Sequence, residues 1–79
     1  MGDEWHWVKR HFKNEGKCYD AAVECLKSML GTEVEFTEPW HWGWTDGIFH
    51  ASRYFMHGGV SRCLCVAWRP PHELAWRVL

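Results

Sequence analysis

The four cysteines and six histidines of this chain are its best candidates for metal binding or catalysis. Cys63 and Cys65 alternate in an extended stretch, which would place both thiols on one face of a strand. Structural zinc sites combine two ligand pairs at C-x₂₋₄-C or H-x₃₋₅-H spacing, and the sequence lacks two such pairs. We therefore predict no cofactor. The alternative is a small zinc-binding structural protein that uses Cys63 and Cys65, with His57 and Cys25 as further ligands.

No motif in the sequence indicates an enzymatic reaction. The G-x-S-x-G, H-E-x-x-H, P-loop and dinucleotide-binding patterns are all missing. Nothing near the cysteines predicts a thiol of lowered pKa, and no segment is typical of an oxyanion hole. We therefore predict that the protein is not an enzyme.

Tryptophan is the most informative residue type, because seven of the 79 residues are tryptophan and five of these lie in residues 5–7 and 40–44. A domain of this size buries only ~60% of the surface of its unfolded chain, while each aromatic ring covers roughly 150–250 Å² when buried. Several of the rings should therefore stay near the surface. Exposed tryptophan is enriched at the hot spots of protein interfaces, so we expect the chain to bind a macromolecule.

The second tryptophan cluster lies in the acidic part of the chain, since residues 20–46 hold six carboxylates and a single lysine. An acidic rim around aromatic anchors is typical of an interface for a basic partner, because the rim charges steer the encounter and the desolvated rings bind. The predicted partner-binding residues are the anchors Trp40, Trp42 and Trp44 and the acidic residues Glu33, Glu35, Glu38 and Asp46.

These features predict a protein-interaction module that masks a surface of its partner. The predicted partner is a protein with a basic surface, in a complex that handles nucleic acid. Small motif-free domains of this composition are the sort that phages and other mobile elements use against host complexes, and by that analogy we expect an inhibitor of the anti-defence type. We expect a monomer or a homodimer.

The elements that would position these residues begin with a helix over residues 19–30. Apolar side chains recur there at helical spacing, charged residues face water, and Gly31 follows at the position where a left-handed cap ends a helix. Residues 3–14 fit a helix through Trp5, Val8 and Phe12, with Asp3 as its N-cap, and they also fit a strand. We favour the helix for this segment.

After Gly31 the hydrophobic period changes from 3.6 to two, which predicts strands over residues 32–37, 40–44, 48–56 and 60–68. Tight turns are predicted at residues 45–47 and 57–59. In the last strand we expect the helix to pack on the face of small residues formed by Cys63, Cys65 and Ala67. Pro70 and Pro71 then end the sheet, and residues 72–79 are predicted to form a short helix.

The predicted fold is therefore a single α+β domain over residues 1–79. Its one main amphipathic helix, at about residues 19–30, packs on a three- to four-stranded antiparallel β-meander, with short helices at both ends. The order of helix, three strands and helix resembles that of a double-stranded-RNA-binding domain. That family carries a basic cluster at the start of its last helix, where this chain has Pro70-Pro71-His72-Glu73.

Nucleic-acid binding is the second alternative to a protein partner. Stacking platforms for single strands lie in basic grooves, whereas Trp40, Trp42 and Trp44 have acidic neighbours that repel phosphate. We therefore predict no direct binding of nucleic acid. The alternative is a domain that uses Arg53 and Arg62 together with stacking tryptophans.

The composition of the chain bears on where it acts. Hydrophobic residues make up 47% and the net charge is −1, as in globular proteins. No apolar stretch approaches the ~20 residues that cross a bilayer, and the first residues carry no secretory signal. We therefore predict no membrane association, a cytoplasmic location and reduced cysteines.

Overall fold

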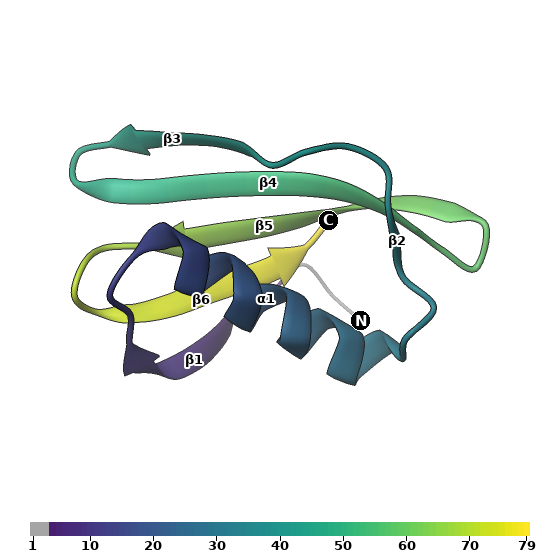
Figure 1. Cartoon of the computed structure of the whole chain (residues 1–79), viewed down its shortest axis with the longest axis horizontal. Helices are drawn as coiled ribbons and strands as arrows, with labels where there is room; N and C mark the ends of the chain where they lie inside the picture. Colours follow the sequence, from purple (N-terminus) through teal and green to yellow (C-terminus); the bar gives the residue numbers. More distant parts are fainter. Residues whose placement is uncertain (1–3) are drawn as a thin grey trace.

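The computed structural model describes residues 4–79, in which a six-stranded antiparallel sheet packs with one helix (Figure 1). In chain order the elements are β1 (His6–His11), α1 (Glu15–Leu30), β2 (Glu35–Phe36), β3 (His41–Thr45), β4 (Ile48–His57), β5 (Val60–Trp68) and β6 (Glu73–Val78). This confirms the predicted α+β class. The predicted three to four strands are too few, because both ends of the chain add a strand to the sheet.

The long β4–β5 hairpin forms the centre of the sheet, whose strand order is β1-β6-β5-β4-β2, with β3 also paired to β4. The structure confirms the two predicted turns. Asp46 and Gly47, between β3 and β4, both have positive φ, as the central residues of a type I′ hairpin turn do. Gly58 and Gly59 do the same between β4 and β5. Glycine adopts these angles without the clash that a side chain would meet.

The two terminal helices that we predicted are strands. Over residues 3–14 the structure has β1, and over residues 72–79 it has β6, which pairs with both β5 and β1. Most of β6 is buried, and Leu74 and Val78 are almost completely covered. This pairing extends the sheet beyond β5, and it depends on contacts between the two chain ends that no local pattern reveals. The proposed N-cap Asp3 lies outside the described residues.

Strand β1 is irregular. Its register against β6 shifts between Val8 and His11, so the residues between them interrupt the ladder. The predicted strand over residues 32–37 is likewise reduced to Glu35–Phe36.

Helix α1 ends where the sequence predicts and begins one turn earlier. Asn14 is its N-cap, and the side-chain oxygen of Asn14 accepts a hydrogen bond from the Lys17 N–H at 3.0 Å. At the other end, the N–H of Gly31 donates to the carbonyl of Lys27 at 2.8 Å. Residues 14–16, whose composition is also typical of a turn, are therefore the N-cap and first two residues of the helix.

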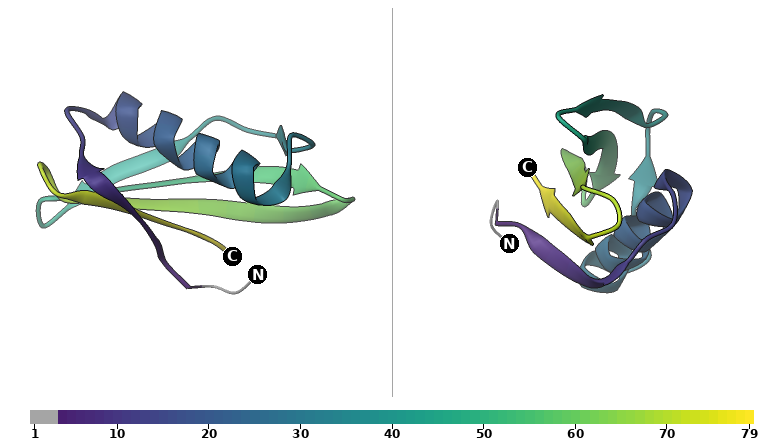
Figure 2. Two further views of the ribbon diagram at one scale, coloured as in Figure 1. Left: turned by 90° about the horizontal axis from the view of Figure 1, so that it is seen from below. Right: turned by 90° about the vertical axis from the view of Figure 1, so that its left-hand side faces the viewer.

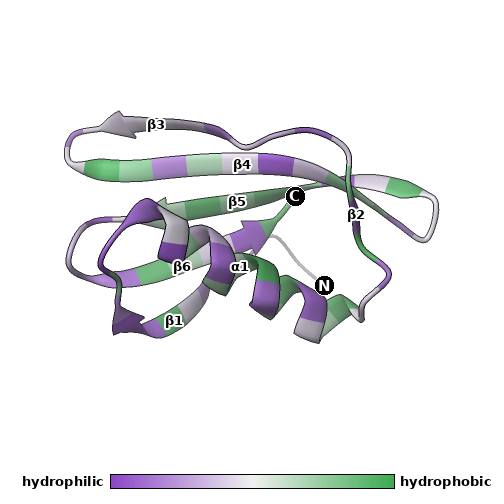
Figure 3. Cartoon of the chain, viewed as in Figure 1, coloured by the Kyte–Doolittle hydropathy of each residue, from purple (hydrophilic) through white to green (hydrophobic). Residues whose placement is uncertain are grey.

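The core lies between α1 and one face of the sheet, which we call the helix face (Figure 2). Leu26 of α1 and Phe49, Leu64 and Val66 of the sheet are buried there. Figure 3 shows the corresponding hydropathy, with β5 hydrophobic along much of its length and polar and apolar turns alternating along α1.

Our prediction that α1 packs on the small side chains of β5 is wrong. The buried residues of β5 are Leu64, Val66 and Trp68, so Cys63 and Cys65 point away from the helix, to what we call the open face. Covering the larger side chains removes more apolar area from water, at ~25 cal/mol per Å².

Candidate interaction surfaces

The two tryptophan clusters lie on opposite faces of the sheet. In β3, Trp42 and Trp44 are paired with Ala51 and Phe49 of β4, which are buried on the helix face. Residues directly opposite one another in an antiparallel pair point to the same side. The two indoles therefore belong to the helix face, at the edge of the sheet.

The first cluster points to the open face. His6 stacks on the buried Trp76 on the helix face, with ring centroids 4.6 Å apart. Trp7 is the next residue along β1 and therefore points to the other side, opposite Ala75 of β6. Trp5 is also on the open face, because the guanidinium carbon of Arg77 lies 4.6 Å from its ring centroid.

Four of the seven indoles are exposed to solvent. The exposed fractions are 40% for Trp5, 58% for Trp7, 66% for Trp42 and 45% for Trp44. Trp40 is half-buried, and Trp68 and Trp76 are buried in the core. The exposed rings thus come from the two sequence clusters.

Core aromatic rings hold the β3 cluster in place. The ring of Trp44 packs against those of Phe49 and Trp68, at centroid distances of 5.3 and 6.3 Å. Trp42 packs against Phe49 at 6.3 Å, and Trp40 stacks on Tyr19 of α1 at 4.5 Å. Each ring therefore has one side supported by the protein, while those of Trp42 and Trp44 also reach solvent.

The four predicted acidic residues do not gather around these indoles as a group. Glu38 precedes β3, with its Oε2 3.8 Å from Nε2 of His41, and Asp46 is in the turn directly after β3. Glu35 instead pairs with Met56, eight residues along β4 from Ile48, which corresponds to about 26 Å at ~3.3 Å per residue.

Glu33 is also remote from Trp44, in a hollow formed with the β4–β5 turn. Only two of the four predicted acidic residues therefore flank β3 closely. The sequence could not show that Glu33 and Glu35 lie far from Trp44, because their positions depend on where along β4 each short strand pairs.

The helix supplies acidic residues that our sequence reasoning did not assign to the site. Asp20 and Glu24 line a hollow of about 470 Å³ together with Tyr19 and Trp40. Burial raises the pKa of Tyr19, and the nearby Glu15 carboxylate raises it further. The signal available in the sequence was the four-residue spacing of Asp20 and Glu24, which places both on one side of a helix.

The open face is hollowed and differs from the β3 edge in charge. Its larger hollow, of about 590 Å³, is lined by Trp5, His41, Trp42, Gly43, His50, Ala51, Ser52, Cys65, Val66 and Arg77. Of the described residues that line it, none is acidic. A second hollow of about 250 Å³ lies beside Trp7 and includes Arg69 and Glu73.

The proposed zinc ligands are not brought together. Cys63 and Cys65 lie on the open face with their sulfur atoms 3.8 Å apart, whereas Cys25 belongs to α1 on the helix face. Nε2 of His57 lies 3.2 Å from the carbonyl oxygen of Leu30. Burial, followed by the neighbouring Cys63, raises the pKa of Cys65 to about 11. Within residues 4–79 no three cysteine, histidine or acidic side chains are close enough to hold a metal ion.

The side chain of Arg53 makes contacts within the protein. Its Nε donates a hydrogen bond to the carbonyl of Glu38 at 2.7 Å, and its guanidinium lies 4.3 Å from the Phe36 ring centroid. Arg62 pairs with the buried Phe55 and so belongs to the helix face as well. Neither arginine therefore lies on the same face as Trp5 and Trp7.

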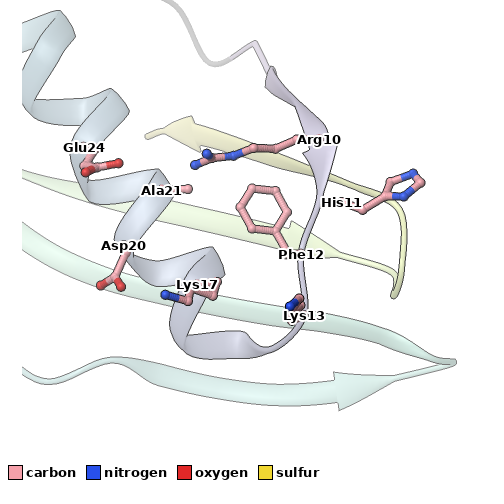
Figure 4. A pocket seen from close by; sticks show the side chains of 8 residues that line it. All are labelled: Arg10, His11, Phe12, Lys13, Lys17, Asp20, Ala21 and Glu24. Atoms are coloured by element: carbon pink, nitrogen blue, oxygen red, sulfur yellow. The ribbon is translucent and has the colours of Figure 1, made fainter.

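A further hollow of about 440 Å³ lies between the end of β1 and the start of α1 (Figure 4). Basic side chains of Arg10, Lys13 and Lys17 line it, and so do the carboxylates of Asp20 and Glu24. The guanidinium of Arg10 lies 5.2 Å from the ring centroid of Phe12. This mixture of charges favours neither an anionic nor a cationic ligand.

Comparison with known protein families, curated proteins and solved structures finds no match for this chain. Its function must therefore be inferred from these surfaces. The part of the chain that the structure describes has no helix of the length and apolar character that crossing a membrane requires.

Proposed function

We propose that the protein is a non-enzymatic interaction module that masks a surface of a macromolecular partner, anchored by Trp42 and Trp44. The observation that carries this proposal is the exposure of two adjacent indoles whose inner sides rest on Phe49. Rings already fixed in place lose little conformational freedom on binding, so more of their burial energy contributes to affinity. We call these two residues, with Trp40 beside them, the β3 surface.

The charges around the β3 surface favour a basic partner. Glu38 and Asp46 are at the two ends of β3. Asp20 and Glu24 lie beside Trp40 together with Lys27 and with Arg53, which already donates a hydrogen bond to the carbonyl of Glu38. Negative charges around aromatic anchors accelerate association with a positive surface and disfavour an acidic one. Glu33 and Glu35 lie outside this surface, so we assign the steering role to the closer carboxylates.

A protein of a nucleic-acid-handling complex is the partner class that fits this chemistry. Such complexes line their grooves with arginine and lysine to neutralise phosphate. A small acidic domain seated there would exclude the nucleic acid and inhibit the complex. By analogy, we propose that the protein acts in the cytoplasm as a phage or mobile-element inhibitor of a host complex.

The test begins with affinity capture from a bacterial lysate, followed by purification of the captured protein and calorimetric titration. Trp42→Ala should weaken binding by ~2 kcal/mol or more, as hot-spot truncations do. Trp7→Ala is the matched control, because Trp7 is a similarly exposed indole on the open face. The partner should lose nucleic-acid binding when the wild-type protein is added.

Equal affinity of wild type and Trp42→Ala for that partner, with both chains folded, would refute the anchor assignment. A captured partner whose nucleic-acid binding is unaffected would refute the masking role.

A further inference from the structure

We infer that the open face of the sheet is a binding surface for single-stranded nucleic acid. It is separate from the β3 surface except at the sheet edge, where Trp42 also lines the larger hollow. The residues that carry this inference are Trp5, Trp7, Tyr54, Arg69 and Arg77. All of them are on strands or directly adjoin them, so a rigid scaffold positions them. The inference does not rest on the proposed masking function, which uses the other side of the sheet.

Three exposed aromatic rings project from this face. Trp5 and Trp7 come from the β1 segment, with exposed fractions of 40% and 58%. Tyr54 of β4 is exposed by 46% and points to the same side, because its neighbour Phe55 is fully buried on the helix face. Unpaired bases stack on aromatic side chains presented by a rigid sheet, and every base offers a flat ring for this contact.

Small side chains form the surface between these rings. Ala67 of β5 faces Ala75 of β6, and Ser52 of β4 faces Cys65 of β5. The solvent side of an antiparallel sheet is usually polar, whereas here it has two hollows, of about 590 and 250 Å³, whose surfaces are largely apolar. Planar groups can lie flat in such hollows without displacing large side chains.

The two hollows of the open face hold two arginines and one carboxylate, a balance that fits phosphate, while Glu35 lies farther along the same face, opposite Met56. Arg77 lies over Trp5 and forms no ion pair with any residue that the structure describes, and exposed Arg69 is in the hollow beside Trp7. The larger hollow includes no acidic residue among those described, and the smaller includes one, Glu73. This differs from the β3 surface, where neighbouring carboxylates repel phosphate.

Two other occupants fit these observations less well. An acidic peptide would neutralise the arginines but would leave the exposed rings without flat partners. A second copy of the chain would meet this face through a two-fold axis, so both copies would use the same patch, and its arginines would find Glu73 as the one carboxylate of the two hollows. A single strand supplies both phosphates and planar bases at regular intervals.

Binding is measured by fluorescence anisotropy with a labelled oligouridylate of roughly ten nucleotides, within the usual site sizes for single strands, at about 50 mM salt. Trp7→Ala should weaken binding roughly five- to 150-fold, which corresponds to stacking of ~1–3 kcal/mol per base. Trp44→Ala is the matched control, an exposed indole on the helix face, and should leave affinity unchanged.

The electrostatic part of the inference has its own pair of variants. Arg69→Gln should weaken binding and reduce the slope of log affinity against log salt by about 0.7, the value for one phosphate contact on a single strand. Arg62→Gln on the helix face should change neither quantity. Circular dichroism and thermal melting of each variant show whether its fold is intact.

Four results would overturn the inference. The first is absence of binding at protein concentrations up to about 100 μM, the weak end of non-specific affinity. The second is equal loss of affinity in folded Trp7→Ala and Trp44→Ala. The third is equal competition by polyglutamate, which would assign the face to acidic peptides. The fourth is a dimer in light scattering that Trp7→Ala dissociates, which would assign the face to a second copy.

Discussion

Phe49 is the residue on which the aromatic cluster beside β3 depends, and replacing it with leucine tests this directly. Four aromatic rings surround it with centroids 5.3 to 6.5 Å away, those of Trp44, Tyr19, Trp42 and Trp68. Phe55 is a matched control in the same strand, because it is equally buried and its aromatic contact is with Phe36 alone, at 6.1 Å, among the described residues.

The expected cost follows from these contacts. A leucine keeps much of the apolar volume, so the packing change costs about 1 kcal/mol at either position. Each lost aromatic pair adds ~0.5 kcal/mol, the low end of the range because the centroids are well separated. Phe49→Leu should therefore cost about 3 kcal/mol and Phe55→Leu about 1.5 kcal/mol. Both variants should stay folded, since a domain of this length has a stability of roughly 4–12 kcal/mol.

Urea denaturation followed by far-ultraviolet circular dichroism measures the two free energies of unfolding. The difference of about 1.5 kcal/mol should also appear in thermal melts, where Phe49→Leu should melt roughly 6–12 °C below Phe55→Leu. If the two variants lose the same stability to within ~0.5 kcal/mol, the additional aromatic contacts of Phe49 do not stabilise the fold.

Two further predictions concern the buried thiols and the β3–β4 turn. Burial raises the pKa of Cys18 from 9.0 to about 12 and that of Cys65 to about 11. Because unfolded thiols lose their protons first, the stabilisation from these neutral thiols is complete below pH 9 and falls as the pH rises toward 11–12. Urea midpoints at about pH 8, 9 and 10 should therefore decrease less in Cys18→Ala than in the wild type, and parallel curves would contradict the argument. In the turn, Gly47→Ala should cost roughly 1–2 kcal/mol because its φ is +75°. Gly43→Ala should cost less, since that glycine has no positive φ and an added methyl group would meet no atom within 4 Å; equal urea midpoints for the two variants would show that the turn angle is not the cause.

Local signals were enough to predict the centre of the fold. The helical pattern before Gly31 and the glycines of the two tight turns specify α1 and the β3–β4–β5 meander, because each depends on residues close together in the chain. The helix start was missed because residues 14–16 are equally typical of a turn, and only the Asn14 cap shows that the helix begins there.

The chain ends could not be predicted in the same way. Trp5, Val8 and Phe12 fit the helical period as well as Trp5 and Trp7 fit the strand period, so the sequence near β1 satisfies both. The segment forms a strand because its backbone pairs with β6, which lies more than sixty residues away in the sequence. Tertiary pairing of this kind overrides local propensity.

The candidate site was predicted only in part, because the neighbours of its indoles also depend on contacts between distant parts of the chain. The prediction that indoles crowd the surface needs only composition and chain length, and four indoles are exposed. Their charged neighbours depend on register and on α1. Glu35 was therefore placed too close to Trp44, and Asp20 was not assigned to the surface.

The irregular ladder of β1 limits what a second chain can do at the sheet edges. An open antiparallel sheet can grow into a fibre when both outer strands accept a new strand. Here β1, the outer strand on one side, is irregular where its pairing with β6 shifts between Val8 and His11, and the other side presents the short strands β2 and β3. A sheet that accepts another strand at one edge only can form a dimer but cannot add further copies. The indoles can therefore stay exposed without leading to a fibre.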